Sequence, residues 1–172
     1  MVMDPEISPS SGSTQMITAM LPASRKIPLE GAWNVRDLGG LPTLSGGSTC
    51  RNRYLRGDSL ANLSEADVRL LLERGVRTVI DLREPGEAAA QPSRLLDRPG
   101  VRVHPVPLFG DLNPIGSTLP TQLGDLYLLC LRHGGPALRR TFELLAGFED
   151  EHGAVLFHCA VGKDRTGIVA AL

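Results

Sequence analysis

The residues best suited to chemistry lie close together near the C-terminal end of the sequence. Residues 158–167 read HCAVGKDRTG, so that five residues separate Cys159 from Arg165. The apolar residues 154–157 before this stretch predict a buried strand, and the apolar residues 168–172 after it predict a helix. A loop that runs from a strand into a helix N-terminus presents unpaired backbone N–H groups, which bind anions. We therefore expect a phosphate-binding loop built around a cysteine.

The side chains of this loop indicate nucleophilic catalysis on a phosphate ester. Gly162 allows the backbone to curve closely around an anion, and Arg165 can bind two phosphate oxygens at once. These cationic surroundings favour the thiolate form of Cys159, which can attack phosphorus in line and form a phosphocysteine intermediate. Thr166 can hydrogen-bond the sulfur and help it to leave in the second step. The expected substrate-binding cradle is completed by the remaining loop residues, Ala160, Val161 and Lys163.

Three aspartates are candidates for the general acid that protonates the leaving oxygen. Asp164 lies inside the loop and needs no loop motion to reach the phosphate, so it ranks first. Asp81 ends a predicted strand, at the sheet edge where ligands gather in α/β folds, and ranks second as an orienting or auxiliary group at the substrate. Asp111 lies in the long loop 109–119 and ranks third.

The loop resembles the signature of the cysteine-dependent protein tyrosine phosphatase superfamily. Its Gly-Lys-Asp-Arg-Thr-Gly form is similar to the microbial branch that contains mycobacterial tyrosine phosphatase B and related bacterial lipid phosphatases. Residues 34–40, which read NVRDLGG, resemble the N-terminal hallmark of the same branch, which lies beside the active-site loop. The resemblance implies that Asn34 and Arg36 lie near the substrate. It also implies hydrolysis of phosphotyrosine, with phosphoserine, phosphothreonine or phosphoinositides as further substrates.

Other interpretations of the loop are weaker. A buried cysteine is usually part of a hydrophobic core, but Cys159 stands where the strand gives way to a glycine-containing loop. A nucleotide-binding loop needs Gly-x-x-x-x-Gly-Lys followed by Ser or Thr, whereas Asp164 follows Lys163 here. The likeness to the cysteine loop of rhodanese-type sulfur carriers is lower. A catalytically silent phosphate-binding or interaction module is the alternative from a different functional class.

Apolar periodicity predicts helices that alternate with short strands. This order is typical of an α/β fold with a mainly parallel central sheet flanked by helices, as the tyrosine phosphatase resemblance also implies. Ser64 and Asp67 form a helix-capping arrangement, and Cys130 lies on the apolar face of a helix and is expected in the core. We expect strands at 77–83, 101–106 and 154–157, a hairpin that turns at 45–47 and returns through 53–56, and helices at 64–74, 86–90, 123–131 and 136–145.

The expected domain organisation is simple. Residues 1–26 are rich in Ser, Pro, Thr and Met without periodicity, and they predict a mobile leader. Residues 27–172 form one phosphatase-like domain. The final helix has only about one and a half turns, and its apolar residues need cover. Since the family continues with further helices, we expect the C-terminal helices of the family domain to be missing, with cover from another subunit as the open alternative.

Composition argues against several other functions. The formal charge is −1, from 18 basic and 19 acidic residues, so no overall field favours nucleic acid. Cys50, Cys130 and Cys159 form neither a metal-ligand pattern nor a disulfide framework, and we expect no metal and no cofactor. No segment predicts a transmembrane helix or a signal peptide. The expected partners are phosphate or another oxyanion and a phosphorylated protein or phosphoinositide. A cytoplasmic location is expected, with signal-independent secretion as the open alternative.

Overall fold

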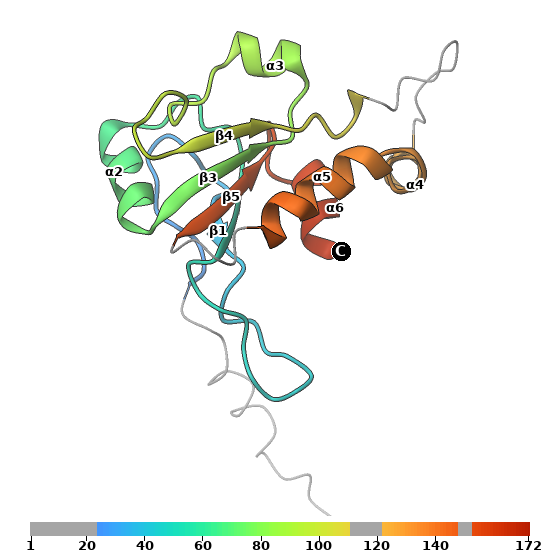
Figure 1. Cartoon of the computed structure of the whole chain (residues 1–172), viewed down its shortest axis with the longest axis horizontal. Helices are drawn as coiled ribbons and strands as arrows, with labels where there is room; N and C mark the ends of the chain where they lie inside the picture. Colours follow the sequence, from blue (N-terminus) through green and yellow to red (C-terminus); the bar gives the residue numbers. More distant parts are fainter. Residues whose placement is uncertain (1–23, 111–121, 148–152) are drawn as a thin grey trace, which may run out of the picture.

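The computed structural model of the protein describes residues 24–110, 122–147 and 153–172. Its centre is a five-stranded sheet with the order β1-β2-β5-β3-β4 (Figure 1). β1 runs antiparallel to β2, and the other neighbouring strands are parallel. The predicted α/β fold with a mainly parallel central sheet is confirmed. The strands are β1 (Arg36–Asp37), β2 (Tyr54–Gly57), β3 (Val76–Asp81), β4 (Arg102–Pro105) and β5 (Ala154–His158).

Helices cover both faces of the sheet. α2 lies on one side, and α4, α5 and α6 lie on the other (Figure 1). Val155 and Phe157 of β5 belong to the core beneath α4–α6, whereas Ala154 and Leu156 belong to the core beneath α2. Because successive side chains of a strand point to opposite faces, the uninterrupted apolar run of β5 supplies both cores. The described helices are α2 (Glu65–Glu73), α3 (Pro85–Ala90), α4 (Leu123–His133), α5 (Gly135–Ala146) and α6 (Asp164–Ala171).

The cap of α2 also holds the N-terminal segment. The Ser64 hydroxyl accepts a hydrogen bond from the Asp67 backbone at 3.2 Å, and the Asp67 carboxylate accepts one from the Ser64 backbone at 3.0 Å. The predicted capping box is therefore confirmed. The same carboxylate accepts backbone hydrogen bonds from Glu30 and Gly31 at 2.9 and 2.8 Å. One buried side chain thus starts a helix and fixes the chain that leads into β1.

α6 begins at Asp164, four residues before the apolar pattern placed its start. The apolar pattern marks the residues that the sheet covers, Ile168 and Val169, and it does not detect a polar first turn. Asp164 favours that position because negative charge stabilises the N-terminus of a helix. The phosphate-loop residues Cys159–Lys163 therefore lead directly into the first turn of α6.

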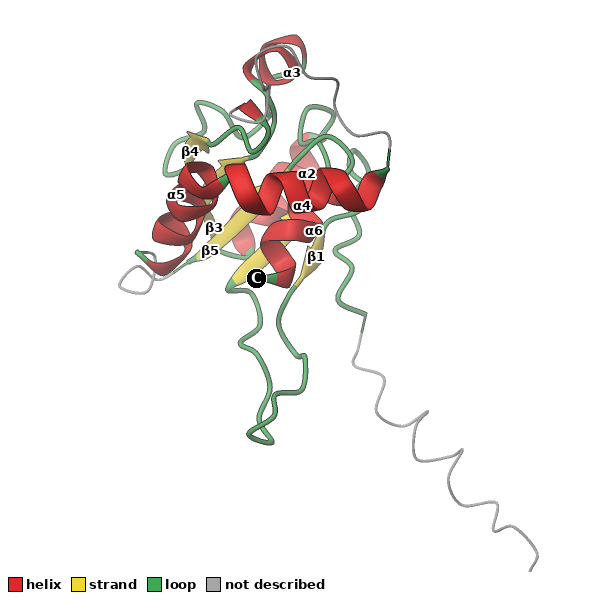
Figure 2. Cartoon of the chain, turned by 90° about the vertical axis from the view of Figure 1, so that its right-hand side faces the viewer, coloured by secondary structure: helices red, strands yellow, loops and turns green. Residues whose placement is uncertain are grey.

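Two segments extend around β1 and β2. The hairpin between these strands projects from the body of the domain, with a turn at Gly46 (φ +83°) (Figure 2). Lys26 pairs with Arg36 of β1, and the Asp37 backbone donates to the Arg25 carbonyl at 2.9 Å. Residues 1–23 of the expected leader and the long loop that contains Asp111 lie outside the described residues. In the described ranges no helix is long and apolar enough to span a membrane.

Candidate active site

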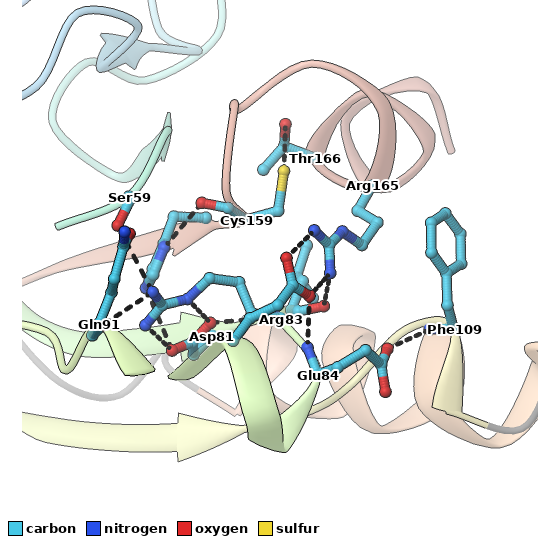
Figure 3. Close-up of polar contacts among 12 residues, drawn as sticks. Ser59, Asp81, Arg83, Glu84, Gln91, Phe109, Cys159, Arg165 and Thr166 are labelled. Carbon is cyan, nitrogen blue, oxygen red and sulfur yellow. Dashed lines mark hydrogen bonds and ion pairs between the residues drawn. The ribbon is translucent and has the colours of Figure 1, made fainter. Parts of the chain in front are cut away.

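Cys159 follows β5 at the carboxyl ends of three parallel strands. Gly57 of β2 and Asp81 of β3 both pair with His158, the last residue of β5. The Cys159 side chain is buried, and its Sγ accepts a hydrogen bond from the Gly162 backbone N–H at 3.2 Å. Figure 3 shows the sulfur directed at Thr166 in the first turn of α6, whose Oγ1 lies 3.9 Å away. The thiol therefore lies inside the loop, within reach of two hydrogen-bond donors.

The carbonyl groups of the loop are anchored on the outside by residues 34–59. The Ser59 backbone N–H donates to the Ala160 carbonyl at 3.0 Å. The Asn34 side-chain amide donates to the Val161 and Gly162 carbonyls at 3.0 Å each. Arg56 donates to the Gly162 and Lys163 carbonyls at 3.0 and 3.2 Å. All four hydrogen-bonded carbonyls are consecutive: Ala160, Val161, Gly162 and Lys163.

This anchoring orients the N–H groups that follow each carbonyl. In a trans peptide the C=O and the next N–H point in opposite directions, so N–H groups face away from the anchoring segment. The Gly162 N–H, which points at Sγ, follows this rule. Gly162 has φ +70°, and a Cβ built there would lie 2.7 Å from backbone atoms of Gly57 and Asp58. Only glycine permits this close approach of the loop backbone to residues 57–58.

Asn34 is itself held in place from both sides. The carboxylate of Asp58 accepts hydrogen bonds from the backbone of Trp33 at 2.9 Å and of Asn34 at 3.1 Å. The Arg36 guanidinium donates to Asn34 Oδ1, which leaves the amide NH₂ group for the loop. Arg36 therefore contacts Asn34, and Asn34 contacts the loop. Asp58 is a site residue that the sequence analysis did not single out.

Arg165 is bound by a carboxylate of α3. Its NH1 and NH2 atoms donate to Glu87 at 2.6 and 2.8 Å. This hydrogen-bonded pair lowers the pKa of Glu87 to about 2 and raises the pKa of Arg165. The Phe109 ring lies on the other side, with its centroid 5.5 Å from the guanidinium carbon (Figure 3). Arg165 NH1 also donates to the Leu82 carbonyl at 3.5 Å. The guanidinium is thus fixed in orientation beside the loop, and the N–H groups that neither Glu87 nor Leu82 uses are available to an anion.

Glu84 contacts both Glu87 and Phe109, the two residues that lie against Arg165. The Glu84 backbone donates to Glu87 at 2.9 Å, and its carboxylate accepts from the Phe109 backbone at 3.1 Å. Glu84 caps α3, and so joins both groups that flank Arg165. Sequence reasoning missed Glu87. The available signal was an acidic residue in a short helix directly after a strand end of an α/β sheet, where ligands gather.

Asp81 lies beneath the loop in a buried ion pair. Its carboxylate accepts hydrogen bonds from the Arg83 side chain at 2.9 and 2.7 Å (Figure 3). Burial acts to raise the pKa of Asp81, but the hydrogen bonds and charge of Arg83 together with the charge of His158 outweigh burial, and the pKa is lowered. His158 Nε2 lies 3.7 Å from the same carboxylate, and burial lowers the pKa of His158. Asp81 therefore contacts Arg83 beneath the loop, and its orienting role at the substrate stays a prediction.

Asp164 lies at the edge of the loop, as the first residue of α6. Its Oδ1 accepts a hydrogen bond from the hydroxyl of Tyr127 on α4. Lys163, the residue before it, is exposed. Asp111 lies outside the described residues. Of the candidate acids that are described, Asp164 is the one within the loop sequence. Among the described residues no cluster of His, Cys, Asp and Glu could hold a metal ion.

Comparison with known proteins identifies the family of the chain. The family model described as "Tyrosine phosphatase family" matches residues 27–172. The chain belongs to this family. The matched region begins in the segment before β1 and includes the anchoring residues, the sheet and the complete cysteine loop.

Two relatives of the tyrosine phosphatase family illustrate the extent of the similarity. A tyrosine-protein phosphatase of Nostoc commune is 37% identical over 123 residues, which cover 69% of this chain and 41% of the relative. The triple specificity protein phosphatase PtpB of Mycobacterium tuberculosis is 30% identical over 185 residues, which cover 87% of this chain and 62% of the relative. The chain thus spans about half the length of these relatives.

Proposed function

We propose that this chain contains the catalytic centre of a phosphomonoester hydrolase in which Cys159 is the nucleophile. The observation that carries the proposal is the outward anchoring of four consecutive loop carbonyls around a buried thiol. It turns backbone N–H groups toward the sulfur, where they can bind a phosphoryl group. Because the donors are already oriented, little reorganisation is needed when charge develops in the transition state.

In the first step Cys159 Sγ attacks phosphorus. The S–P bond forms as the bond between phosphorus and the leaving oxygen breaks, and Asp164 gives its proton to that oxygen. Arg165 binds the equatorial oxygens of the loose, metaphosphate-like group through the N–H groups that Glu87 does not use. The products of this step are a phosphocysteine and a free alcohol or phenol.

In the second step a water molecule hydrolyses the phosphocysteine. Asp164, now a carboxylate, accepts a proton from the water as its oxygen attacks phosphorus and the S–P bond breaks. The Thr166 hydroxyl lies 3.9 Å from Sγ and can donate to the departing thiolate, as the Gly162 N–H does at 3.2 Å. Inorganic phosphate leaves, and both catalytic residues return to their starting protonation states.

The proposed substrates are phosphotyrosine first, and phosphoserine, phosphothreonine or phosphoinositides as well. Trp33 and Val161 are 78% and 64% exposed and flank Asn34 at the loop, where they offer apolar surface to the ring of a phosphotyrosine. The exposed Lys163 adds positive charge for substrates that carry several phosphates. The reactive thiolate favours a reducing compartment, so we propose that the protein acts in the cytoplasm.

The decisive experiment compares Cys159→Ser with a matched cysteine variant. Cys159→Ser should abolish hydrolysis of p-nitrophenyl phosphate while it still binds vanadate, measured by calorimetry. Cys50→Ser changes an exposed cysteine outside the loop and should retain wild-type turnover. Full activity of Cys159→Ser would overturn the nucleophile assignment. A wild-type protein that binds phosphopeptides without hydrolysing them would instead be a silent binding module.

A further inference from the structure

Tyr127 and Asp164 come from different helices and meet at the edge of the cysteine loop. The Tyr127 hydroxyl donates a hydrogen bond to Asp164 Oδ1, and both residues are partly buried. Asp164 begins α6, and its position is fixed by the loop and the helix. The hydroxyl reaches it from α4, 37 positions earlier in the sequence.

α4 holds the tyrosine in a defined position. Cys130, three residues after Tyr127 and on the same helix face, is completely buried in the core beneath α4–α6. The Tyr127 ring packs against the same core. Since the two residues share one face, the packing of Cys130 fixes the rotation of α4 and directs the phenol toward α6.

The hydrogen bond selects which carboxyl oxygen can carry the catalytic proton. Oδ1 is occupied as an acceptor from Tyr127, so in the protonated acid the proton is on Oδ2. When the bond to the leaving oxygen breaks, that proton passes from Oδ2 to the leaving oxygen. When water attacks the phosphocysteine, Oδ2 receives a proton from the water. Tyr127 keeps its own proton and remains a donor to Oδ1 in both steps.

We propose that Tyr127 is a positioning residue that holds the carboxyl group of Asp164 with Oδ2 directed at the leaving group. The inference rests on the proposed function, in which Asp164 is the general acid. Tyr127 contacts neither the thiol nor the phosphate in this role; it acts through Asp164. The hydrogen bond to the Asp164 carboxylate also raises the pKa of Tyr127 above its ordinary value.

The test compares Tyr127→Phe with Tyr54→Phe on two substrates. Tyr54 donates its hydroxyl to the Leu145 carbonyl of α5 at 3.3 Å, away from the loop, and is the other tyrosine of the chain. Tyr127→Phe keeps the packed ring and should lower kcat about tenfold for an alkyl phosphate, whose leaving group needs the proton. It should lower kcat less than about twofold for p-nitrophenyl phosphate, with KM unchanged. Tyr54→Phe should leave both rates unchanged.

A double variant separates positioning from general destabilisation. If Tyr127 acts through Asp164, adding Tyr127→Phe to Asp164→Asn should cause no further loss on the alkyl phosphate. An additive loss, or an equal loss on both substrates, would overturn the role of Tyr127. If Asp164→Asn itself shows no dependence on the leaving group, the assignment of the general acid fails, and this inference fails with it.

A spectroscopic titration tests the contact without any turnover. Deprotonation of Tyr127 is followed by ultraviolet absorbance in Tyr54→Phe, which isolates the Tyr127 signal, and in the same variant with Asp164→Asn added. Removing the negative charge in Asp164→Asn should lower the pKa of Tyr127. A Tyr127 pKa that does not change in this variant would contradict the hydrogen bond and overturn the proposal, whatever the activity of the enzyme.

Discussion

The Arg165 guanidinium donates two hydrogen bonds to the Glu87 carboxylate, at 2.6 and 2.8 Å. The two residues are 78 positions apart, and the contact joins the cysteine loop to the short helix α3. A guanidinium that is tied on one edge can present its remaining N–H groups in a fixed plane, which suits two phosphate oxygens. The orientation of the Arg165 side chain therefore depends on two segments that are far apart in the sequence.

Glu87→Gln should weaken phosphate binding and catalysis although Glu87 does not contact the substrate. The loss of the charged hydrogen-bonded pair frees the Arg165 side chain, and kcat/KM should fall about tenfold. Glu143→Gln on α5, where Glu143 forms an exposed pair with Arg140, is the matched control and should have wild-type kcat/KM. Steady-state kinetics with p-nitrophenyl phosphate decide the question. Equal kcat/KM values for Glu87→Gln and Glu143→Gln would show that Arg165 does not need its hydrogen bonds to Glu87.

The ion pair between Arg165 and Glu87 should persist in acid. Because the pKa of Glu87 is lowered to about 2, its hydrogen bonds are present above the ordinary glutamate pKa and are lost only as the pH falls through about 2. NMR titration of the glutamate side-chain carboxyl carbons should show the Glu87 carboxyl still ionised at pH 3. In Arg165→Lys that carboxyl should titrate nearer its usual range. A Glu87 carboxyl that protonates near pH 4 in the wild type would contradict the pairing.

Gly162→Ala should abolish activity and destabilise the fold. The alanine would have both an unfavourable positive φ and a Cβ 2.7 Å from backbone atoms of Gly57 and Asp58. Gly46 also has a positive φ, but a Cβ there meets nothing within 4 Å, so Gly46→Ala isolates the cost of backbone strain. That cost is about 1 kcal/mol, or roughly 2–4 °C in Tm. Thermal denaturation should show a clearly larger decrease for Gly162→Ala, and equal decreases would rule out the backbone clash.

Asp81→Asn should destabilise the protein because it leaves the buried Arg83 without its counter-ion. The two side chains are 7% and 2% exposed, and removing one partner of such a pair costs about 3–5 kcal/mol. Since the pKa of Asp81 is lowered, the wild type should keep this contribution above about pH 4 and lose it as the pH falls further. Urea denaturation at pH 7 and pH 3 measures both effects. Asp125→Asn, at an exposed position in the first turn of α4, removes only a helix-end charge and should cost about 1 kcal/mol or less.

Lys163→Ala tests the range of substrates. Lys163 caps α6 and its side chain is exposed beside the loop, where positive charge attracts multiply phosphorylated head groups. We expect kcat/KM to fall several-fold more for a phosphoinositide than for a phosphotyrosine peptide, with the difference reduced by added salt. Lys26→Ala removes the other lysine of the chain and should affect both substrates equally. Equal losses in Lys163→Ala would remove the support for a lipid substrate.

The sequence predicts the central sheet and the position of Cys159 at the end of a strand because both leave a local pattern. The apolar residues of β5 and the glycine-containing loop after it are contiguous. Pro105, which indicates either an edge strand or a strand that ends early, is the last residue of the edge strand β4. Glu87 and Tyr127 leave no such pattern. A glutamate in a short helix has the same sequence appearance whether it faces solvent or Arg165, and only the fold brings the pair together.

The contacts of Asn34 and Arg36 also could not be predicted from the sequence alone, although these residues are only two positions apart. The resemblance predicted that both lie near the substrate, and the structure places Asn34 on the loop carbonyls and Arg36 on Asn34. A linear sequence shows two polar residues two positions apart, and it does not show which one contacts the other. Arg56, to which the sequence analysis gave no role, makes three hydrogen bonds to the loop and α6, at 3.0–3.2 Å.

The anchored carbonyls of residues 160–163 mean that the cysteine signature is not a self-contained anion receptor. Its backbone is shaped by Asn34, Arg56 and Ser59, which come more than 100 residues earlier in the chain. A synthetic peptide of the signature, or the same ten residues grafted between a strand and a helix of another protein, would lack these donors and would have its carbonyls free to turn inward. Transfer of the loop to another protein therefore requires two separate segments of polypeptide. One carries the sulfur, and the other donates the hydrogen bonds that keep the loop carbonyls pointing outward.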